Sequence, residues 1–248
     1  MRLPILLLSL ALPLAPPLRA NGLDDLRASL QRLQGGDPVK ATLEHSFWRQ
    51  TTDDKKPIIS QGKVAAQLEE GPQGLKVTWA RPTLQQAVKE LAAQEQEPDR
   101  TAPTRTALRN LDPLEATEAL SHAEALLRDL GQAQLQEERS EPWQGRPARL
   151  LVLKLQPKIP ASQRKYLKEL KADAKVWVGP DGLPLAFSSA VAYRGSRMLI
   201  SFEGGSNQER QFAKVGGRLV VTKATSEDRN SGLGASSLTK KVTTLTIL

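Results

Sequence analysis

The sequence predicts an α+β fold that is mainly antiparallel β: a strongly curved sheet of about eleven strands, a half-barrel, with amphipathic helices covering its concave face. Two observations lead to this prediction. Short apolar runs alternate with glycine-rich turns such as Gly179-Pro180-Asp181-Gly182 over most of the chain after Gly131, which is typical of an antiparallel meander. Helical periodicity is confined to a few segments, whereas a doubly wound parallel sheet needs a helix between successive strands.

A sandwich and a closed barrel would also use many short antiparallel strands. The helices favour the curved, open sheet. Their apolar stripes must be buried against something, and a closed barrel of this size has little room inside for several helices.

The N-terminal part predicts one helix and three strands. Asn21 can cap a helix that Gly35-Gly36 ends, and its apolar positions recur at helical spacing: Leu23, Leu26, Leu30 and Leu33. Alternation of apolar and polar residues then predicts half-buried strands near residues 39–47, 64–68 and 75–79.

A helical insertion, residues 83–131, is expected to follow. Its first helix has an apolar stripe made of Leu84, Ala87, Val88 and Leu91. The polar, proline-bearing stretch 94–106 is interpreted as a mobile loop within this insertion. A second helix begins at Asp112-Pro113, where Glu115 completes a capping-box pattern, and is expected to run to Gly131.

The remaining chain is expected to be a meander that only one short basic helix, Ser162 to Ala172, interrupts. Its turns are placed at 179–182, 194–196, 203–207 and 216–217. The strands are expected near 133–139, 147–156, 174–178, 184–194, 197–204, 209–215, 217–225 and 238–248.

Residues 1–20 have the layout of a secretory signal peptide. Arg2 is followed by an apolar stretch that is too short for a bilayer span, and we expect cleavage after Ala20. An uncleaved membrane anchor is the alternative, which Pro13, Pro16 and Pro17 disfavour. Residues 21–248 are then expected to form a single exported, periplasmic domain. Because the chain has no cysteine, disulfides and a lipid anchor on cysteine are excluded.

The formal charge of +8 does not by itself indicate nucleic-acid binding. Basic residues are spread along the chain, aromatic residues are scarce, and no nucleic-acid motif is present. The densest basic run contains Arg164, Lys165, Lys168 and Lys171. It is either the solvated face of a helix or a docking surface for anionic lipid or an acidic partner.

No catalytic constellation is visible, so the protein is not expected to be an enzyme, although a hydrolase with an unrecognised site stays open. Ser-x-x-Lys occurs at Ser162–Lys165 and Ser237–Lys240, but the Ser-Asp-Asn and Lys-Thr-Gly elements that penicillin-binding proteins and class A β-lactamases also need are missing. We interpret His45 as a core residue and His122 as solvated, because no other ligand lies at metal-binding spacing near either. Neither a metal nor another cofactor is expected.

Several short motifs resemble the periplasmic lipoprotein-carrier superfamily. GLKVTWARP (74–82) is similar to a carrier strand that ends in Arg-Pro, and KVWVGPDGLPLAF (175–187) with YRGSRMLISFE (193–203) is similar to the late hairpins of those carriers. The order of helix, three strands, helical insertion and long meander agrees with this resemblance. It implies a curved sheet with an apolar cavity that shelters acyl chains crossing the periplasm. Arg81 matches the arginine of the Arg-Pro pair and has no assigned role. The chain is longer than a typical carrier.

The leading functional hypothesis is therefore a soluble, monomeric periplasmic carrier that binds a lipid or lipoprotein acyl chain or a similar amphiphile. Alternation places the candidate lining at Leu43, Phe47, Leu75, Val77, Trp79, Met198, Ile200 and Phe202. The alternative is a scaffold or regulatory module that binds another envelope protein through a sheet edge or the basic segment. The size of the cavity distinguishes the two hypotheses.

Overall fold

A computed structural model describes residues 21–33, 35–52 and 57–248, so the predicted signal segment lies outside the described residues. The strands are β1 (Val39–Thr52), β2 (Ile58–Gly71), β3 (Gly74–Thr78), β4 (Gln134–Ser140), β5 (Arg149–Lys154), β6 (Leu167–Val178), β7 (Pro184–Arg197), β8 (Ile200–Val215), β9 (Arg218–Gly232) and β10 (Ala235–Ile247). The helices are α1 (Gly22–Gln31), α2 (Arg81–Gln96), α3 (Pro103–Asn110), α4 (Pro113–Leu120), α5 (Ala123–Leu130) and α6 (Ala161–Arg164).

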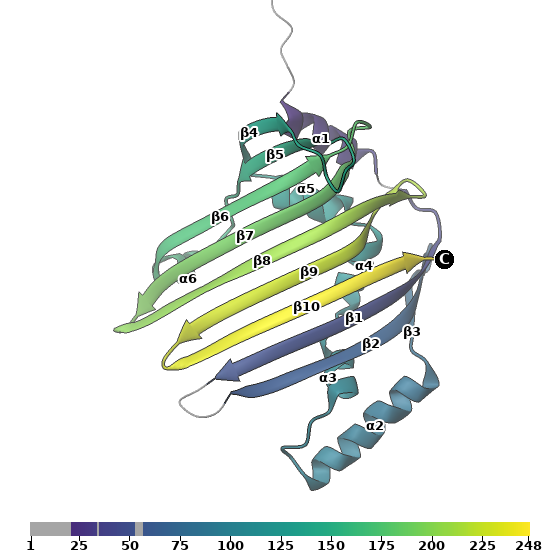
Figure 1. The fold of residues 1–248 in the computed structure, drawn as a ribbon, viewed down its shortest axis with the longest axis vertical. Helices are drawn as coiled ribbons and strands as arrows, with labels where there is room; N and C mark the ends of the chain where they lie inside the picture. The colour runs from purple at the N-terminus through teal and green to yellow at the C-terminus, as the bar shows by residue number, and fades with distance from the viewer. Residues whose placement is uncertain (1–20, 34, 53–56) are drawn as a thin grey trace, which may run out of the picture.

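The strands form one curved, unclosed antiparallel sheet (Figure 1), which confirms the predicted fold class. Its ten-stranded order is β3-β2-β1-β10-β9-β8-β7-β6-β5-β4. The first and last strands of the chain are neighbours: β1 pairs with β10 from Ala41 opposite Ile247 to Thr52 opposite Ser236. Because β3 and β4 are the two outer strands, the chain between them must cross the whole width of the sheet.

The expected number of strands was one too high, because the strands expected at 197–204 and 209–215 are parts of a single strand, β8, which begins at Ile200. The expected turn at 203–207 lies inside this strand, where Gly204 faces Tyr193 and Gly205 faces Ala192 of β7. Pairing on both sides supplies the backbone hydrogen bonds that a turn would have lost, so the two glycines stay extended. The turn between β7 and β8 was expected at 194–196, which lies within β7; it is at Met198 and Leu199, both with positive φ.

The basic helix expected over Ser162 to Ala172 was also wrong. Only the four residues of α6 are helical, and β6 begins at Leu167. Along this part of β6, Glu169 faces Arg194 and Ala172 faces Val191 of β7. Here the tertiary pairing of neighbouring strands overrides local helix propensity.

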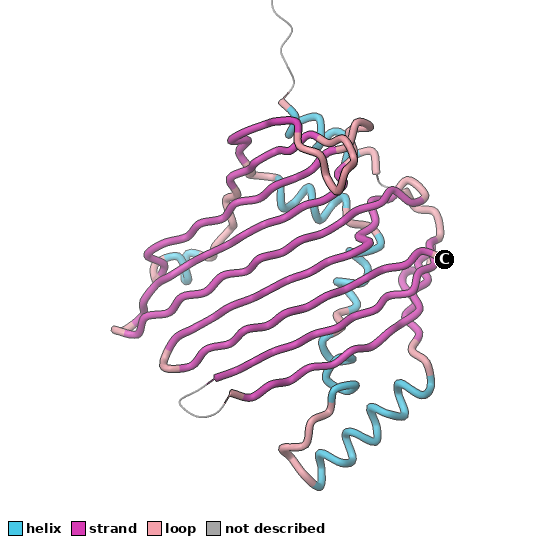
Figure 2. Tube along the Cα trace, viewed as in Figure 1, coloured by secondary structure: helices cyan, strands magenta, loops and turns pink. Residues whose placement is uncertain are grey.

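Helices α3, α4 and α5 cross one face of the sheet, which we call the helix face; the other is the open face (Figures 1 and 2). Two large core clusters form under them. One packs α1 and α5 on β5–β9, and the other packs α4 on β1, β2, β9 and β10. Odd-numbered residues of β1 up to Phe47 are buried on the helix face, as their alternation predicts.

The single helix expected from Asp112 to Gly131 is two helices. Asp112 caps α4 as predicted, because its side chain accepts a hydrogen bond from the Leu114 backbone N–H. The break falls at Ser121 and His122, where the His122 backbone N–H donates to the Leu219 carbonyl of β9 at 2.8 Å. A hydrogen bond to the sheet thus replaces one within the helix and redirects the chain.

Helix α2 does not bury the apolar stripe that the sequence predicts. Leu84, Val88 and Leu91 are exposed, Val88 to 65 %, whereas the buried residue of this helix is Glu90. The stretch 94–106 holds the end of α2, a short connection and the start of α3. Figure 1 shows α2 standing away from the sheet beyond β2, so its apolar side has no strand to cover.

Close approach of backbone to backbone seats α3 on the sheet. A Cβ atom at Gly62 of β2 would lie 2.0 Å from the carbonyl oxygen of Pro103 at the start of α3. Only glycine allows this contact, because any side chain would have to push α3 away from β2.

We expect Gly62→Ala to lower the free energy of unfolding by about 1–3 kcal/mol through overpacking against α3. Gly71→Ala is the matched control in the same strand, because a Cβ there meets nothing within 4 Å. Urea denaturation of both variants and the parent measures the effect. Equal loss of stability in the two variants would contradict the proposed contact.

Candidate functional site

A cavity of about 340 Å³ lies on the helix face, between α4 and strands β1, β8, β9 and β10. Its apolar side is contributed by both the sheet and the helical insertion: Leu43, Leu111, Ala116, Ala119, Val221 and Ala224. Because the alanine side chains of α4 are short, they do not fill the space between the helix and the sheet. The size is at the lower end of the range usual for small-molecule pockets.

Charged and polar side chains form the rim of this helix-face cavity. Lys241 of β10 and Glu115 of α4 approach to 3.8 Å across it. Arg210 of β8 pairs with Asp129 of α5 at 3.2 Å and also donates to Gln208. The cavity therefore combines an apolar wall with charges of both signs, which suits the two parts of an amphiphilic guest.

His122 lines the same cavity and is buried, so the prediction that it is solvated was wrong. It is 4 % exposed, and its ring stacks on Phe212 with centroids 5.5 Å apart. Its Nδ1 lies 3.3 Å from the Glu118 carbonyl oxygen, and among the described residues Nε2 has no hydrogen-bond partner. Burial, together with the charges of Arg210 and Arg128, lowers the pKa of His122 to about 4, against the opposing effect of the Glu118 carbonyl.

His45 is a buried core residue, as predicted. Its Nδ1 lies 3.0 Å from the Thr243 hydroxyl of the neighbouring strand. Burial lowers the pKa of His45, and the charge of Lys241 lowers it further. Both histidines are thus held neutral beside the helix-face cavity. Within the described residues, no group of three or more potential metal ligands converges.

The structure does not bring the eight predicted lining residues together. Leu43 lines the helix-face cavity, whereas Phe47 packs with Val64 and Ala107 in a separate small cluster. Leu75 and Val77 of β3, and Trp79 just after this strand, are partly buried. They pack against the core cluster under α4.

The other three predicted lining residues lie at the β7–β8 hairpin. Met198 is 85 % exposed there, Ile200 is exposed and Phe202 is half-buried. Phe202 is 6.5 Å from the Tyr193 ring. Alternation identifies the face of a strand but not where along that face a helix covers it.

The predicted basic surface is spread over α6 and the beginning of β6 instead of one helix face. Lys171 pairs with Glu169 at 2.8 Å, and Lys165 lies over the Tyr166 ring at 5.0 Å. Arg164 and Lys168 border a shallow hollow next to Ile159. Alternation along β6 therefore divides charges that a helix would have gathered on one side.

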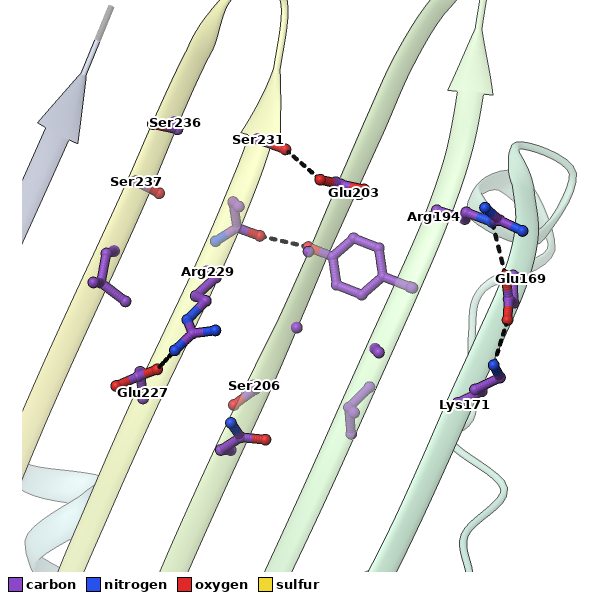
Figure 3. A pocket seen from close by; sticks show the side chains of 18 of the residues that line it. Glu169, Lys171, Arg194, Glu203, Ser206, Glu227, Arg229, Ser231, Ser236 and Ser237 are labelled. Atoms are coloured by element: carbon purple, nitrogen blue, oxygen red, sulfur yellow. Dashed lines mark hydrogen bonds and ion pairs between the residues drawn. The ribbon is translucent and has the colours of Figure 1, made fainter.

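A larger hollow, of about 630 Å³, lies on the open face over β6–β10 (Figure 3) and is bordered by charged side chains. Ala192 and Gly205 lie in its floor, where their small size leaves the space open. Glu169 bridges Lys171 and Arg194 at 2.8 and 2.7 Å on one side. Glu227 bridges Arg229 and Lys240 on the other. No motif indicated this hollow, and the only sequence signal is the alternation of charged residues along these strands.

No family model and no curated protein matches the chain. Among solved structures, the crystal structure of MucB in complex with MucA(peri) is similar over 91 % of this chain and 93 % of that chain. The TM-score is 0.19 and the sequence identity is 10 %. A likeness at this level carries no functional conclusion for this chain. Among the described helices, none is both long enough and apolar enough to cross a membrane.

The lowered pKa of His122 predicts a loss of stability in mild acid. The unfolded chain takes up a proton near the ordinary pKa of 6.5, while the folded protein takes it up only near 4, so stability falls as the pH falls through this window. His122→Phe keeps a ring beside Phe212 and removes the proton. Between pH 7.5 and pH 4, the stability of the variant relative to the parent should rise by on the order of 3 kcal/mol.

Urea unfolding at a series of pH values measures this difference. If the variant and the parent lose stability in parallel, His122 does not titrate in the way that its burial implies.

Proposed function

We propose that this protein is a non-enzymatic binding protein that holds the apolar part of an amphiphile in the helix-face cavity. The observation that carries the proposal is the combination of an apolar wall and a rim of opposite charges in one partly enclosed space. No residue that would break or form a bond in the guest is needed for this function.

The size of the cavity limits the guest to a short apolar segment unless α4 moves. Each buried methylene contributes ~0.8 kcal/mol, so a segment of six would supply roughly 5 kcal/mol before the costs of association. Charged groups of the guest would be met by Lys241 and Arg210 or by Glu115. Binding of useful affinity then needs contributions from both parts of the guest.

Outward movement of α4 is the step that would admit a longer chain. The helix is short, and its N-terminal end follows Asn110 and Leu111, where the chain leaves α3. Beside the cavity α4 presents the small residues Ala116 and Ala119, whereas Leu120 holds its C-terminal end in the core. The place where the protein acts is inferred from the sequence alone. Residues 1–20 predict export, so we propose that the protein acts in the periplasm.

The alternative role, a scaffold that binds an envelope protein, is supported by the edge of the sheet. Within the described residues β3 pairs only with residues 67–71 of β2, which leaves the first half of β2 at the edge. Ile58 and Ile59 are exposed there, Ile58 to 66 %. An open edge with apolar side chains is a surface on which an extended segment of another protein can add a strand.

Filling the helix-face cavity should abolish uptake of an apolar probe. Ala119→Trp puts an indole into the space between α4 and the sheet, and Leu114→Trp puts the same group on the exposed side of the same helix. We expect the Ala119 variant to bind a fluorescent fatty acid at least tenfold more weakly and the Leu114 variant to bind it like the parent. Fluorescence titration measures both affinities.

Two results would contradict the amphiphile proposal. One is a parent protein that takes up no fatty acid and carries none in native mass spectrometry after purification. The other is equal binding by the two tryptophan variants, which would place the guest elsewhere. Either result would turn attention to protein partners at the sheet edge.

A further inference from the structure

Helix α2 carries a regular apolar seam on the side that faces solvent. Leu84, Val88 and Leu91 are spaced four and three residues apart, and all are exposed. Continuing the same spacing reaches Arg81 at the start of the helix and Glu95 near its end. The five residues therefore form a heptad-like line along one face, with a positive charge at one end and a negative charge at the other.

The opposite side of α2 is polar, and it fixes the direction in which the seam faces. Glu90 accepts a hydrogen bond from the Arg105 backbone N–H at 2.9 Å and another from Gln86 at 3.1 Å. The Arg105 guanidinium donates to Gln94 at 2.6 Å. These bonds hold α2 to the N-terminal end of α3 by its polar face.

The seam consequently points away from α3, because Glu90 lies about 200° around the helix from Val88. An amphipathic helix normally turns its apolar side to its own protein. Here the arrangement is inverted, and the apolar side is presented outward.

We infer that α2 is a self-association surface, on which the α2 helix of a second copy of this chain packs antiparallel. Pairing centred on Val88 places Leu84 of one copy beside Leu91 of the other. The same pairing brings Arg81 of each copy next to Glu95 of the other, so the two ends attract. In a parallel pair, like charges would meet at both ends.

The charge pattern favours a second copy over a membrane surface. A helix that binds anionic lipid carries several basic residues beside its apolar face. Beside this seam there is one lysine, Lys89, and neutral residues such as Gln85 and Ala92. The charged residues of this side of α2 are therefore Arg81, Lys89 and Glu95, which give a net charge of only +1.

The interface is expected to be weak. Three apolar residues per helix bury less area than the roughly 1,200 Å² of a standard stable interface. A dimer held by such a seam forms at micromolar or higher concentration and exchanges readily, which suits a regulated contact. The inference does not depend on the amphiphile proposal, because the seam and the helix-face cavity share no residue.

A charge-exchange experiment tests the antiparallel geometry. Arg81→Glu puts two acidic residues together at each end of the pair, and Glu95→Arg puts two basic residues together. Each single variant should raise the dimer dissociation constant roughly three- to tenfold, and the double variant should restore it to the parent value. Sedimentation equilibrium from about 5 µM to about 500 µM measures the constants.

The variants are chosen so that they do not unfold the helix. A negative charge at the N-terminus and a positive charge at the C-terminus both favour the helix dipole. Val88→Glu removes the centre of the seam and should raise the dissociation constant more than tenfold. Lys214→Glu makes the same charge change as Arg81→Glu on an exposed residue of β8 and should leave the constant unchanged.

Four results would overturn the inference. The parent could stay monomeric over the whole concentration range. A dimer that survives Val88→Glu would be formed by another surface. If the double variant does not regain the dimer affinity that the single variants lose, antiparallel pairing is excluded. Binding of α2 to lipid vesicles in place of self-association would assign the seam to a membrane.

Discussion

The pairing of β1 with β10 is the constraint on which the rest of the structure depends. It joins the N-terminal hairpin strands to the C-terminal end of the meander, from Ala41 opposite Ile247 to Thr52 opposite Ser236. Once this ladder forms, β3 and β4 become the opposite edges of one sheet. The residues between them have to cross the sheet, and a crossing segment is stable only if it buries an apolar side on the way.

The position of the candidate site follows from that crossing. Helices α3 and α4 run over β1, β2 and β9, the backbone of His122 bonds to β9, and α5 then reaches the other core cluster. The helices do not cover the whole face of the sheet. A cavity therefore remains beside α4, where the alanines of this helix face Leu43 and Ala224 of the sheet. At the beginning of the crossing α2 extends beyond β2, which exposes its seam. The cavity and the seam are thus two consequences of one topology.

Much of this could be predicted from residue patterns. Alternation in β1 identified the buried face, glycine-rich turns identified several hairpins, and the Asp112 cap identified the start of α4. The errors share a cause. The expected turn at 203–207 and the expected basic helix both became strand, because neighbouring strands on each side offer a complete set of hydrogen bonds. Local propensity is small compared with that gain.

The sequence by itself determined the class of fold, since period-two and helical-period apolar patterns are properties of short segments. It also determined that α2 carries a positive charge at one end and a negative charge at the other, with apolar residues between them. Only the tertiary structure decided where these features lie. Whether an apolar stripe is buried or exposed, and whether Met198 and Leu43 share a cavity, depends on contacts between residues far apart in the chain. Such contacts are fixed by strand order and helix placement, which no local pattern contains.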